Sequence, residues 1–377
     1  MRMDSVSFRR RLTERTEGAA RFCVKFGLIL LFVTCCSLAL VSYAWGQTES
    51  VASVRRDNLT AKDAKALEEG LNLNPDNLAA RDQLIRYYFE ETLTSQAPEL
   101  EEKRDKHIFW LIEHHPESEM AGEPETDIVP TTSESMEAYQ RGRQLWLQAV
   151  DKHPDNQRIL CNAAQFVLLF DRKIGQELLE KAVALDPGDV QAGSKLAQSY
   201  ELERAQVTSL GEKTSLAQKA LSVRERGLER ADSEHRFYEL KDLAFSAFEA
   251  GEIAKAQQYA SELLQAAPEF KHDWNYGNAL HNGNIILGRI ALRRDDIAGA
   301  KEHLLAAGQT PGSPQLNSFG PNMILAKELL EKNERDVVLA YLESCEKFWK
   351  MDRGKLQSWI ATIKGGGTPD FGANLLY

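Results

Sequence analysis

The amino-acid sequence predicts an all-α fold, a solenoid of stacked helix-turn-helix repeats. A polar corner recurs between amphipathic helices about every 33 to 43 residues, a period typical of solenoids. Apolar residues recur at the helical spacing i, i+3 and i+4, and no alternating β-branched run is long enough for a sheet. The corners lie at Asn74-Pro75, His153-Pro154, Asp186-Pro187 and Ala267-Pro268.

The predicted helices follow one another along residues 58–364, which we expect to be the solenoid. Asp232 or Ser233 is placed to cap the helix that begins a repeat without a proline corner. Residues 117–137 interrupt the periodicity with seven acids, no base, one glycine and two prolines, so an acidic flexible loop is expected there. The first helices are expected near 63–73, 77–91 and 99–115, and the periodicity resumes at 136–152.

The C-terminal residues 365–377 are predicted to be a capping tail. The last repeat of a solenoid has no following neighbour, so its apolar surface needs a cover. Phe371, Leu375, Leu376 and Tyr377 supply apolar side chains for this purpose. We expect them to fold back toward Trp349 and Trp359.

The composition suits a folded, acidic protein. With 43% hydrophobic and 27% charged residues, the chain has enough apolar side chains to bury a core. Residues 1–46 hold seven bases and three acids, which leaves 39 bases and 53 acids in the remainder. Nucleic-acid binding depends on clustered cations that neutralise phosphates, so no nucleic-acid partner is predicted for this acidic body.

The N-terminal residues 1–46 have the pattern of an export signal. A basic stretch precedes the uncharged residues 26–45, and Ala44-Trp45-Gly46 resembles a signal-peptidase site with cleavage before Gln47. The apolar stretch also reaches the roughly 20 residues that span a bilayer, so a retained inner-membrane anchor is the alternative. Both interpretations predict a periplasmic body, which begins with a polar linker at 47–57.

The cysteines do not indicate a disulfide framework. Three of the five lie in the leader, and the other two are Cys161 and Cys345. These two are far apart in a linear array, so we expect two small buried side chains rather than a bridge.

The helix pairs of residues 155–350 resemble the tetratricopeptide repeat, a helix-turn-helix unit of about 34 residues. This resemblance implies a right-handed superhelical solenoid whose helices cross closely at small residues and end at left-handed turns at Gly251 and Asn333. Segments 106–118, 310–323 and 369–377 also resemble exported bacterial repeat proteins without an assigned biochemical function. The repeat pattern is carried by Ile159, Ala163, Phe166, Gly175, Leu179 and Ala182; Leu240, Leu243, Ala244, Gly251, Ala256 and Leu263; Leu287, Gly288, Ala291, Ala300, Leu304 and Ala307; and Leu325, Ala326, Leu329, Asn333, Val338 and Leu342.

The same resemblance implies that the concave face, made by the first helix of each pair, binds an extended peptide. Its mixed aromatic and basic character suits a peptide with apolar side chains and some negative charge. The asparagines and the histidine of 273–289 could bind a ligand or could satisfy carbonyls freed by a kink at Gly283. The predicted partner-binding residues are Tyr238, Lys241, Phe245, Phe248, Asn278, His281, Asn282, Ile285, Arg289 and Lys327.

The sequence carries no recognised catalytic motif, phosphate loop or dinucleotide fingerprint. The adjacent pair His114-His115 fits a helix end better than a metal site. We therefore predict a non-catalytic interaction scaffold for a protein or peptide, without cofactor or metal. Two alternatives stay open: a glycan-active enzyme, an α/α toroid with paired carboxylates, and a structural membrane-attached spacer.

Overall fold

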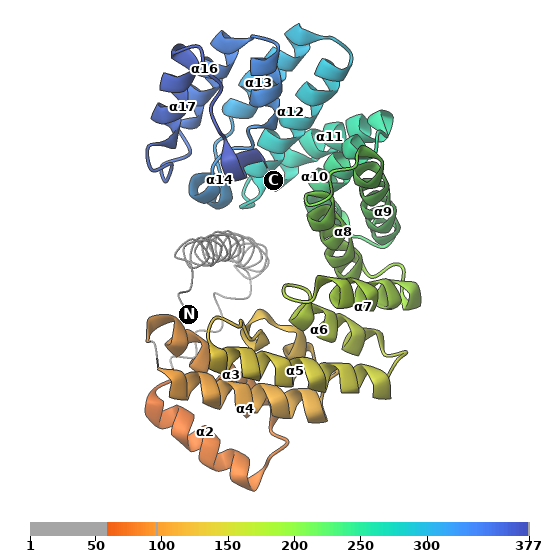
Figure 1. The fold of residues 1–377 in the computed structure, drawn as a ribbon, viewed down its shortest axis with the longest axis vertical. Helices are drawn as coiled ribbons and strands as arrows, with labels where there is room; N and C mark the ends of the chain where they lie inside the picture. Colours follow the sequence, from red (N-terminus) through yellow and green to blue (C-terminus); the bar gives the residue numbers. More distant parts are fainter. Residues whose placement is uncertain (1–58, 96, 376–377) are drawn as a thin grey trace, which may run out of the picture. The chain divides into compact units, whose positions relative to one another are not determined.

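The protein is described here from a computed structural model, which defines residues 59–95 and 97–375. These residues are helical, with no β-strand among them, and they belong to one compact unit that begins at Leu59 (Figure 1). The α-helices are α2 (Ala61–Leu73), α3 (Leu78–Thr94), α4 (Pro98–His114), α5 (Ser133–Lys152), α6 (Gln157–Val167), α7 (Arg172–Leu185), α8 (Val190–Arg204), α9 (Leu210–Leu228), α10 (Ser233–Glu249), α11 (Ile253–Ala266), α12 (Tyr276–Arg293), α13 (Ile297–Gly308), α14 (Pro314–Phe319), α15 (Ile324–Glu331), α16 (Arg335–Cys345) and α17 (Lys355–Lys364).

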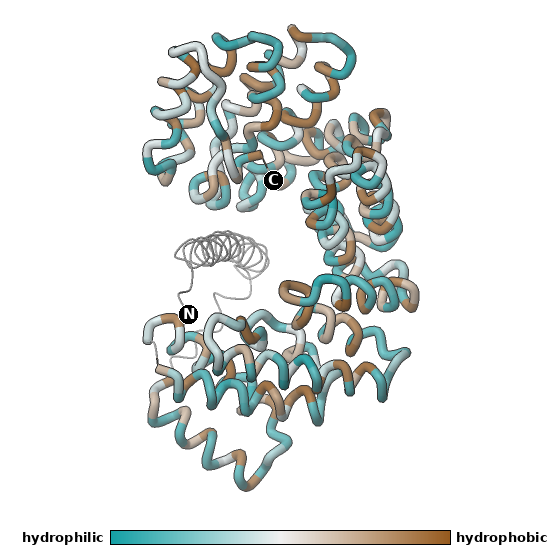
Figure 2. The backbone as a smooth tube through the Cα atoms, in the orientation of Figure 1, coloured by the Kyte–Doolittle hydropathy of each residue, from teal (hydrophilic) through white to brown (hydrophobic). Residues whose placement is uncertain are grey.

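Helices that follow one another in the sequence pack against one another. The most extensive packing joins α6 to α7, α8 to α9, α10 to α11 and α12 to α13, and each pair then packs against the next. Apolar and polar positions alternate along the helices (Figure 2), as expected for helices that bury one face. The buried side chains form four clusters that succeed one another along the chain. This is a repeat-like helical fold, as predicted.

The proline corners are helix connections with the same cap. Asn77, Asn156 and Asp189 follow the first three corners and accept a hydrogen bond from the backbone N–H three residues later. The connection without a proline is capped by Asp232, whose Oδ1 accepts from the N–H of His235 at 2.8 Å. The predicted cap is thus confirmed, and each cap satisfies one of the free donors at a helix start.

Three successive helix pairs share a left-handed turn. Gly251, Asp295 and Asn333 have φ of 84°, 57° and 65°. In each case the next residue donates its N–H to the carbonyl five positions earlier. This pattern closes the C-terminus of a helix, and only glycine, asparagine and aspartate adopt its backbone conformation readily. The left-handed turns predicted at Gly251 and Asn333 are confirmed, and Asp295 makes the third.

Small residues let neighbouring helices approach closely. A Cβ added at Gly288 would lie 2.3 Å from Cδ2 of Leu325, so α12 and α15 could not keep their separation with a larger residue there. Ala244 and Ala326 are fully buried at related positions.

The acidic segment between α4 and α5 differs from the predicted flexible loop at 117–137. It forms two 3₁₀ helices, Glu119–Gly122 and Pro124–Thr126, and α5 already begins at Ser133. Ala121 and Ile128 are buried in the main core. Sequence reasoning gave weight to the seven acids and overlooked the small and apolar residues between them.

The tail after α17 returns to the last helices. The Phe371 ring lies 5.0 Å from that of Trp359, the expected neighbour. The Asn374 side-chain amide donates to the carbonyls of Phe319 and Pro321 at 3.0 and 2.9 Å. Leu376 and Tyr377 lie outside the described residues.

The leader 1–46 and the linker 47–57 also lie outside the described residues. Among residues 59–95 and 97–375, none of the helices is both long enough and apolar enough to cross a membrane.

Ala256 tests the helix register. Its side chain is fully buried on α11, so Ala256→Leu should overpack the helix crossing and cost about 1 to 3 kcal/mol of unfolding free energy. Ala254→Leu, at an exposed position of the same helix, is the matched control. Thermal unfolding of both variants checks this, and equal midpoints would contradict the register.

Candidate functional site

The predicted partner-binding residues lie on α10, α12 and α15, but half of them are buried. Lys327 is exposed, and Tyr238, Lys241, Phe245 and Asn282 are partly exposed. The predicted residues that the fold buries are Phe248, Asn278, His281, Ile285 and Arg289. These five are packed inside the protein, so the surface that a partner could contact is smaller than predicted.

The buried residues have structural partners. Ile285 belongs to the core, and the Arg289 guanidinium stacks on the Phe248 ring at 4.2 Å. His281 uses Nδ1 to donate to the carbonyl of Ala307, while its Nε2 accepts from the N–H of Asn322. Burial lowers the pKa of His281 to about 4, so the ring is neutral at physiological pH.

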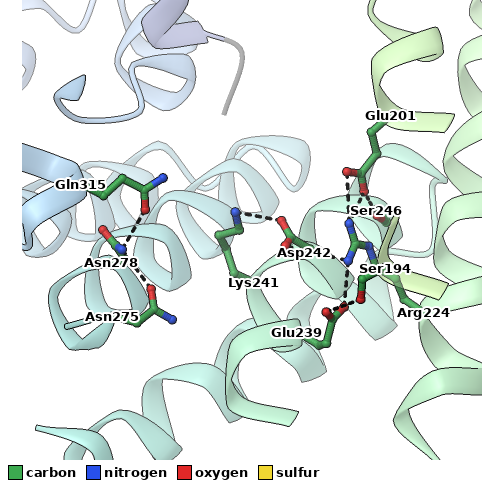
Figure 3. A network of polar contacts seen from close by, with 10 residues as sticks. All are labelled: Ser194, Glu201, Arg224, Glu239, Lys241, Asp242, Ser246, Asn275, Asn278 and Gln315. Carbon is green, nitrogen blue, oxygen red and sulfur yellow. Dashed lines mark hydrogen bonds and ion pairs between the residues drawn. The ribbon is translucent and has the colours of Figure 1, made fainter. Parts of the chain in front are cut away.

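The polar stripe of α12 mainly binds the segment that follows α13. Asn278 donates to the side-chain oxygens of Asn275 and Gln315, both at 2.9 Å (Figure 3), and it accepts from the Ser313 hydroxyl. Asn284 alone satisfies a carbonyl of its own helix, that of Leu280. The stripe therefore serves largely to tie α12 to residues 307–322.

A buried arginine that sequence reasoning missed lies beside this face. Arg224 on α9 has a side chain that is only 3% exposed. Its Nη1 donates to Glu239 of α10 at 2.8 Å, and its Nη2 donates to Glu201 of α8 at 3.2 Å. Asp242 of α10 is a third carboxylate, 3.9 Å from Nη1. Three helices thus meet at one guanidinium (Figure 3).

We call Arg224 and its three carboxylates, together with the polar groups that contact them, the Arg224 cluster. The Ser194 and Ser246 hydroxyls donate to Glu239 and Glu201, and Lys241 pairs with Asp242 at 2.8 Å. Two cations and three carboxylates give the cluster a formal charge of about −1.

The charges of the cluster stabilise one another. Burial alone would lower the pKa of Arg224, but Glu201, Asp242 and Glu239 outweigh it and raise that pKa well above its ordinary value. Burial alone would raise the pKa of Asp242, but Lys241 and Arg224 hold it below its usual range. Arg224 and Asp242 are therefore both ionised at physiological pH.

A second row of ion pairs crosses four helices. Glu249 of α10 binds Arg204 of α8 at 2.8 Å and Arg289 of α12 at 3.0 Å. Arg289 also binds Glu328 of α15 at 3.0 Å. The Arg289 side chain is 8% exposed, whereas that of Glu328 is 32% exposed. We call the partly exposed surface over the Arg224 cluster and this row the charged face; its residues are Glu201, Arg204, Lys241, Asp242, Glu249 and Glu328, with Arg289 buried beneath them.

A sequence pattern could have predicted the contacts of this face. Three of the contacts, Ser194 to Glu239, Glu201 to Ser246 and Arg204 to Glu249, join residues 45 positions apart. A search for complementary polar residues one repeat apart could have found them. Sequence reasoning instead examined each helix separately and took the acids for isolated surface charges.

The remaining candidates have ordinary surroundings. His114 stacks on Trp110 at the end of α4, as expected for a helix end. Cys161 is partly buried and Cys345 is buried, both as free thiols. Among the described residues, no three histidines, cysteines or carboxylates are grouped so that they could hold a metal ion.

Substitution of Arg224 tests the energetics of the Arg224 cluster. Arg224→Met should cost about 3 to 5 kcal/mol of unfolding free energy, because it leaves the buried Glu239 without its cation. Arg204→Met, at a partly exposed pair, should cost at most about 1 kcal/mol. Urea unfolding followed by circular dichroism measures both costs. A similar small loss in both variants would contradict the assigned role of Arg224.

Comparison with known proteins adds no identity. No family model matches the chain, and no curated protein sequence is significantly similar to it.

Proposed function

We propose that this chain is a non-catalytic scaffold that binds an extended segment of a partner protein across its charged face. The observation that carries the proposal is the unbroken row of ion pairs from α8 through α10 and α12 to α15. Such a row presents groups of both signs along several repeats, which is the geometry that an extended peptide needs.

The rigidity of the charged face favours binding. The carboxylates of Glu201 and Glu328, each about one-third exposed, are bound by the buried guanidinium groups of Arg224 and Arg289. A partner then meets groups that are already oriented, and less side-chain entropy is lost on association. The partly exposed rings of Tyr238 and Phe245 lie on α10, which also carries part of the charged face. They offer apolar contact to a partner.

The charge of the face changes the expected ligand. The sequence suggested a peptide with some negative charge because Lys241, Arg289 and Lys327 are basic. Lys241 and Arg289 are neutralised within the face by Asp242, Glu249 and Glu328. The partner of this face should therefore carry both signs of charge rather than a net negative charge.

We also propose that the helix pairs form a right-handed superhelical solenoid of tetratricopeptide-like repeats. The shared left-handed turns and the small residues at the crossings support this assignment. In such a solenoid the first helices of the pairs, here α8, α10, α12 and α15, line one continuous surface.

Site-specific crosslinking tests the proposed binding. A photoreactive amino acid replaces Asn282, which is partly exposed on α12, or Glu302, which is exposed on α13. In the source cells, position 282 should give discrete adducts with a partner, identified by mass spectrometry, and position 302 should not. Identical adducts from both positions would contradict a binding face on the first helices.

A charge reversal adds a matched control. Lys327→Glu should reduce the adducts from position 282 several-fold, because Lys327 is exposed on α15 and precedes Glu328 of the charged face in the sequence. Lys332→Glu makes the same change at an exposed residue just after the end of α15 and should have no effect. Absence of adducts at both positions would favour the spacer alternative.

We propose in addition that the chain is exported and that its body lies in the periplasm. The basic stretch, the apolar residues 26–45 and the small residues before Gln47 support export. N-terminal sequencing of the protein from its source cells should begin at Gln47. A start at Met1 in the membrane fraction would indicate a retained anchor, and a start at Met1 in the cytosolic fraction would contradict export.

A further inference from the structure

Residues 116–130, which we call the acidic segment, lie on the helices around them in the way a bound peptide lies on its receptor. The two 3₁₀ helices of the segment pack against α3, α4 and α6. Each of these three helices contributes a polar side chain to the segment. We call this surface the cradle; its polar residues are Arg86, Arg104, Asn162 and Gln165.

The cradle binds the backbone of the segment through Asn162. This side chain is buried, and its amide donates to the carbonyl of Pro116 at 2.9 Å and to that of Ser118 at 2.8 Å. A Cβ added at Gly122 would lie 2.3 Å from Oδ1 of Asn162, so only glycine fits against the amide. Recognition of alternate carbonyls is independent of the segment's side chains, and Gly122 fixes its position.

The cradle also binds the acids of the segment. Nη1 of Arg86 donates to Glu125 at 2.7 Å, and Asp82 orients Arg86 from the same helix at 2.9 Å. Arg104 donates to the backbone carbonyl of Asp127, and Gln165 donates to its carboxylate, both at 3.3 Å. Arg86 and Glu125 thus make a charge-assisted hydrogen bond, whereas the carboxyl group of Asp127 faces a neutral amide.

The fit is incomplete, which weakens the binding of the segment to the cradle. Within the described structure, Oε2 of Glu125, Oδ1 of Asp127 and Nε of Arg104 are buried without a hydrogen-bond partner. Each such group costs about 1 to 3 kcal/mol relative to water. A segment that regains hydration on release is held less tightly than its contacts suggest.

We propose that the cradle is a binding site for an acidic peptide and that the acidic segment is its intramolecular occupant, which a matching peptide can replace. The ligand is an extended chain with a glycine at the position of Gly122 and carboxylates at those of Glu125 and Asp127. This site is separate from the charged face and does not depend on its function.

Docking of the segment should depend on pH. Burial raises the pKa of Asp127 to about 7, and Gln165, Lys195 of α8 and Arg104 of α4 offset this only in part, while Glu125 adds to it. A raised pKa means that the docked state holds a proton that the released state gives up. The contribution of Asp127 to docking is therefore fully present below the ordinary carboxyl pKa of about 4 and is lost as pH rises through 7.

A peptide exchange experiment tests the proposal on the full chain. The variant Gly122→Val expels the chain's own segment by a clash with Asn162 while leaving every cradle residue unchanged. A fluorescent peptide with the sequence of residues 116–130 should bind this variant at least tenfold more tightly than it binds the native chain. Its affinity should be several-fold higher at pH 6 than at pH 8.

Two control peptides make the result specific. One carries Gly122→Val itself, and the other has the same composition in scrambled order. Neither should bind. Equal binding of the scrambled peptide, or no binding of the native peptide to a variant with native helical circular dichroism, would overturn the proposal.

Hydrogen exchange of the native chain covers the case in which the variant fails to fold. Amides of residues 121–128 should exchange through local opening, several-fold faster at pH 8 than at pH 6 after correction for the intrinsic rate. Exchange of these amides only together with those of α6 would show that the segment is a fixed part of the core and would overturn the proposal.

Discussion

Burial of the Arg224 guanidinium is the constraint on which the arrangement of α8, α9 and α10 depends. Removal of such an ion from water costs several kcal/mol unless other groups replace its hydration. Glu201 and Glu239 come from two other helices to do so at Nη1 and Nη2, though not at Nε, and serine hydroxyls support both carboxylates. A shift of one helix turn in any of the three helices would break these contacts, so the cluster fixes their register.

The same constraint explains why the charged face is both rigid and accessible. Arg289 is buried between Glu249 and Glu328, which reach it from the edge of the surface. Glu249 uses one oxygen for Arg289 and the other for Arg204, while the side chain of Glu328 stays about one-third exposed. The interaction that stabilises the packing of α10, α12 and α15 therefore also creates the surface that a partner would meet.

The sequence predicted the fold better than the site, for a physical reason. Helix periodicity, proline corners and left-handed turns are local signals, so the helices and the turns at Gly251 and Asn333 could be predicted from neighbouring residues. Burial is decided by contacts between repeats. A cation such as Arg289 looks exposed on its own helix and becomes buried only when carboxylates from other repeats cover it.

Similar reasoning applies to the acidic segment. A run of acids without bases predicts a solvated loop as long as its surroundings are unknown. Here Ala121 and Ile128 reach the core, and the charges opposite the acids come from α3 and α4, which precede the segment by up to 39 residues. The glycine at 122 was visible in the sequence, but its partner Asn162 lies on a helix that follows.

The charged face and the cradle differ in the hydrogen-bond donors that they offer to a ligand. In the Arg224 cluster the guanidinium is already bound by carboxylates of its own fold, so a partner must interact with balanced, partly hydrated charges. In the cradle, Asn162 and Arg86 direct their donors to the acidic segment, whose carbonyls and carboxylates are those of a peptide. If the segment leaves, water replaces its acceptors, and a competing chain can cover these donors again without a desolvation penalty only where it places carbonyls and acids at the same spacing. The chemistry of the occupant therefore defines the chemistry of its competitor.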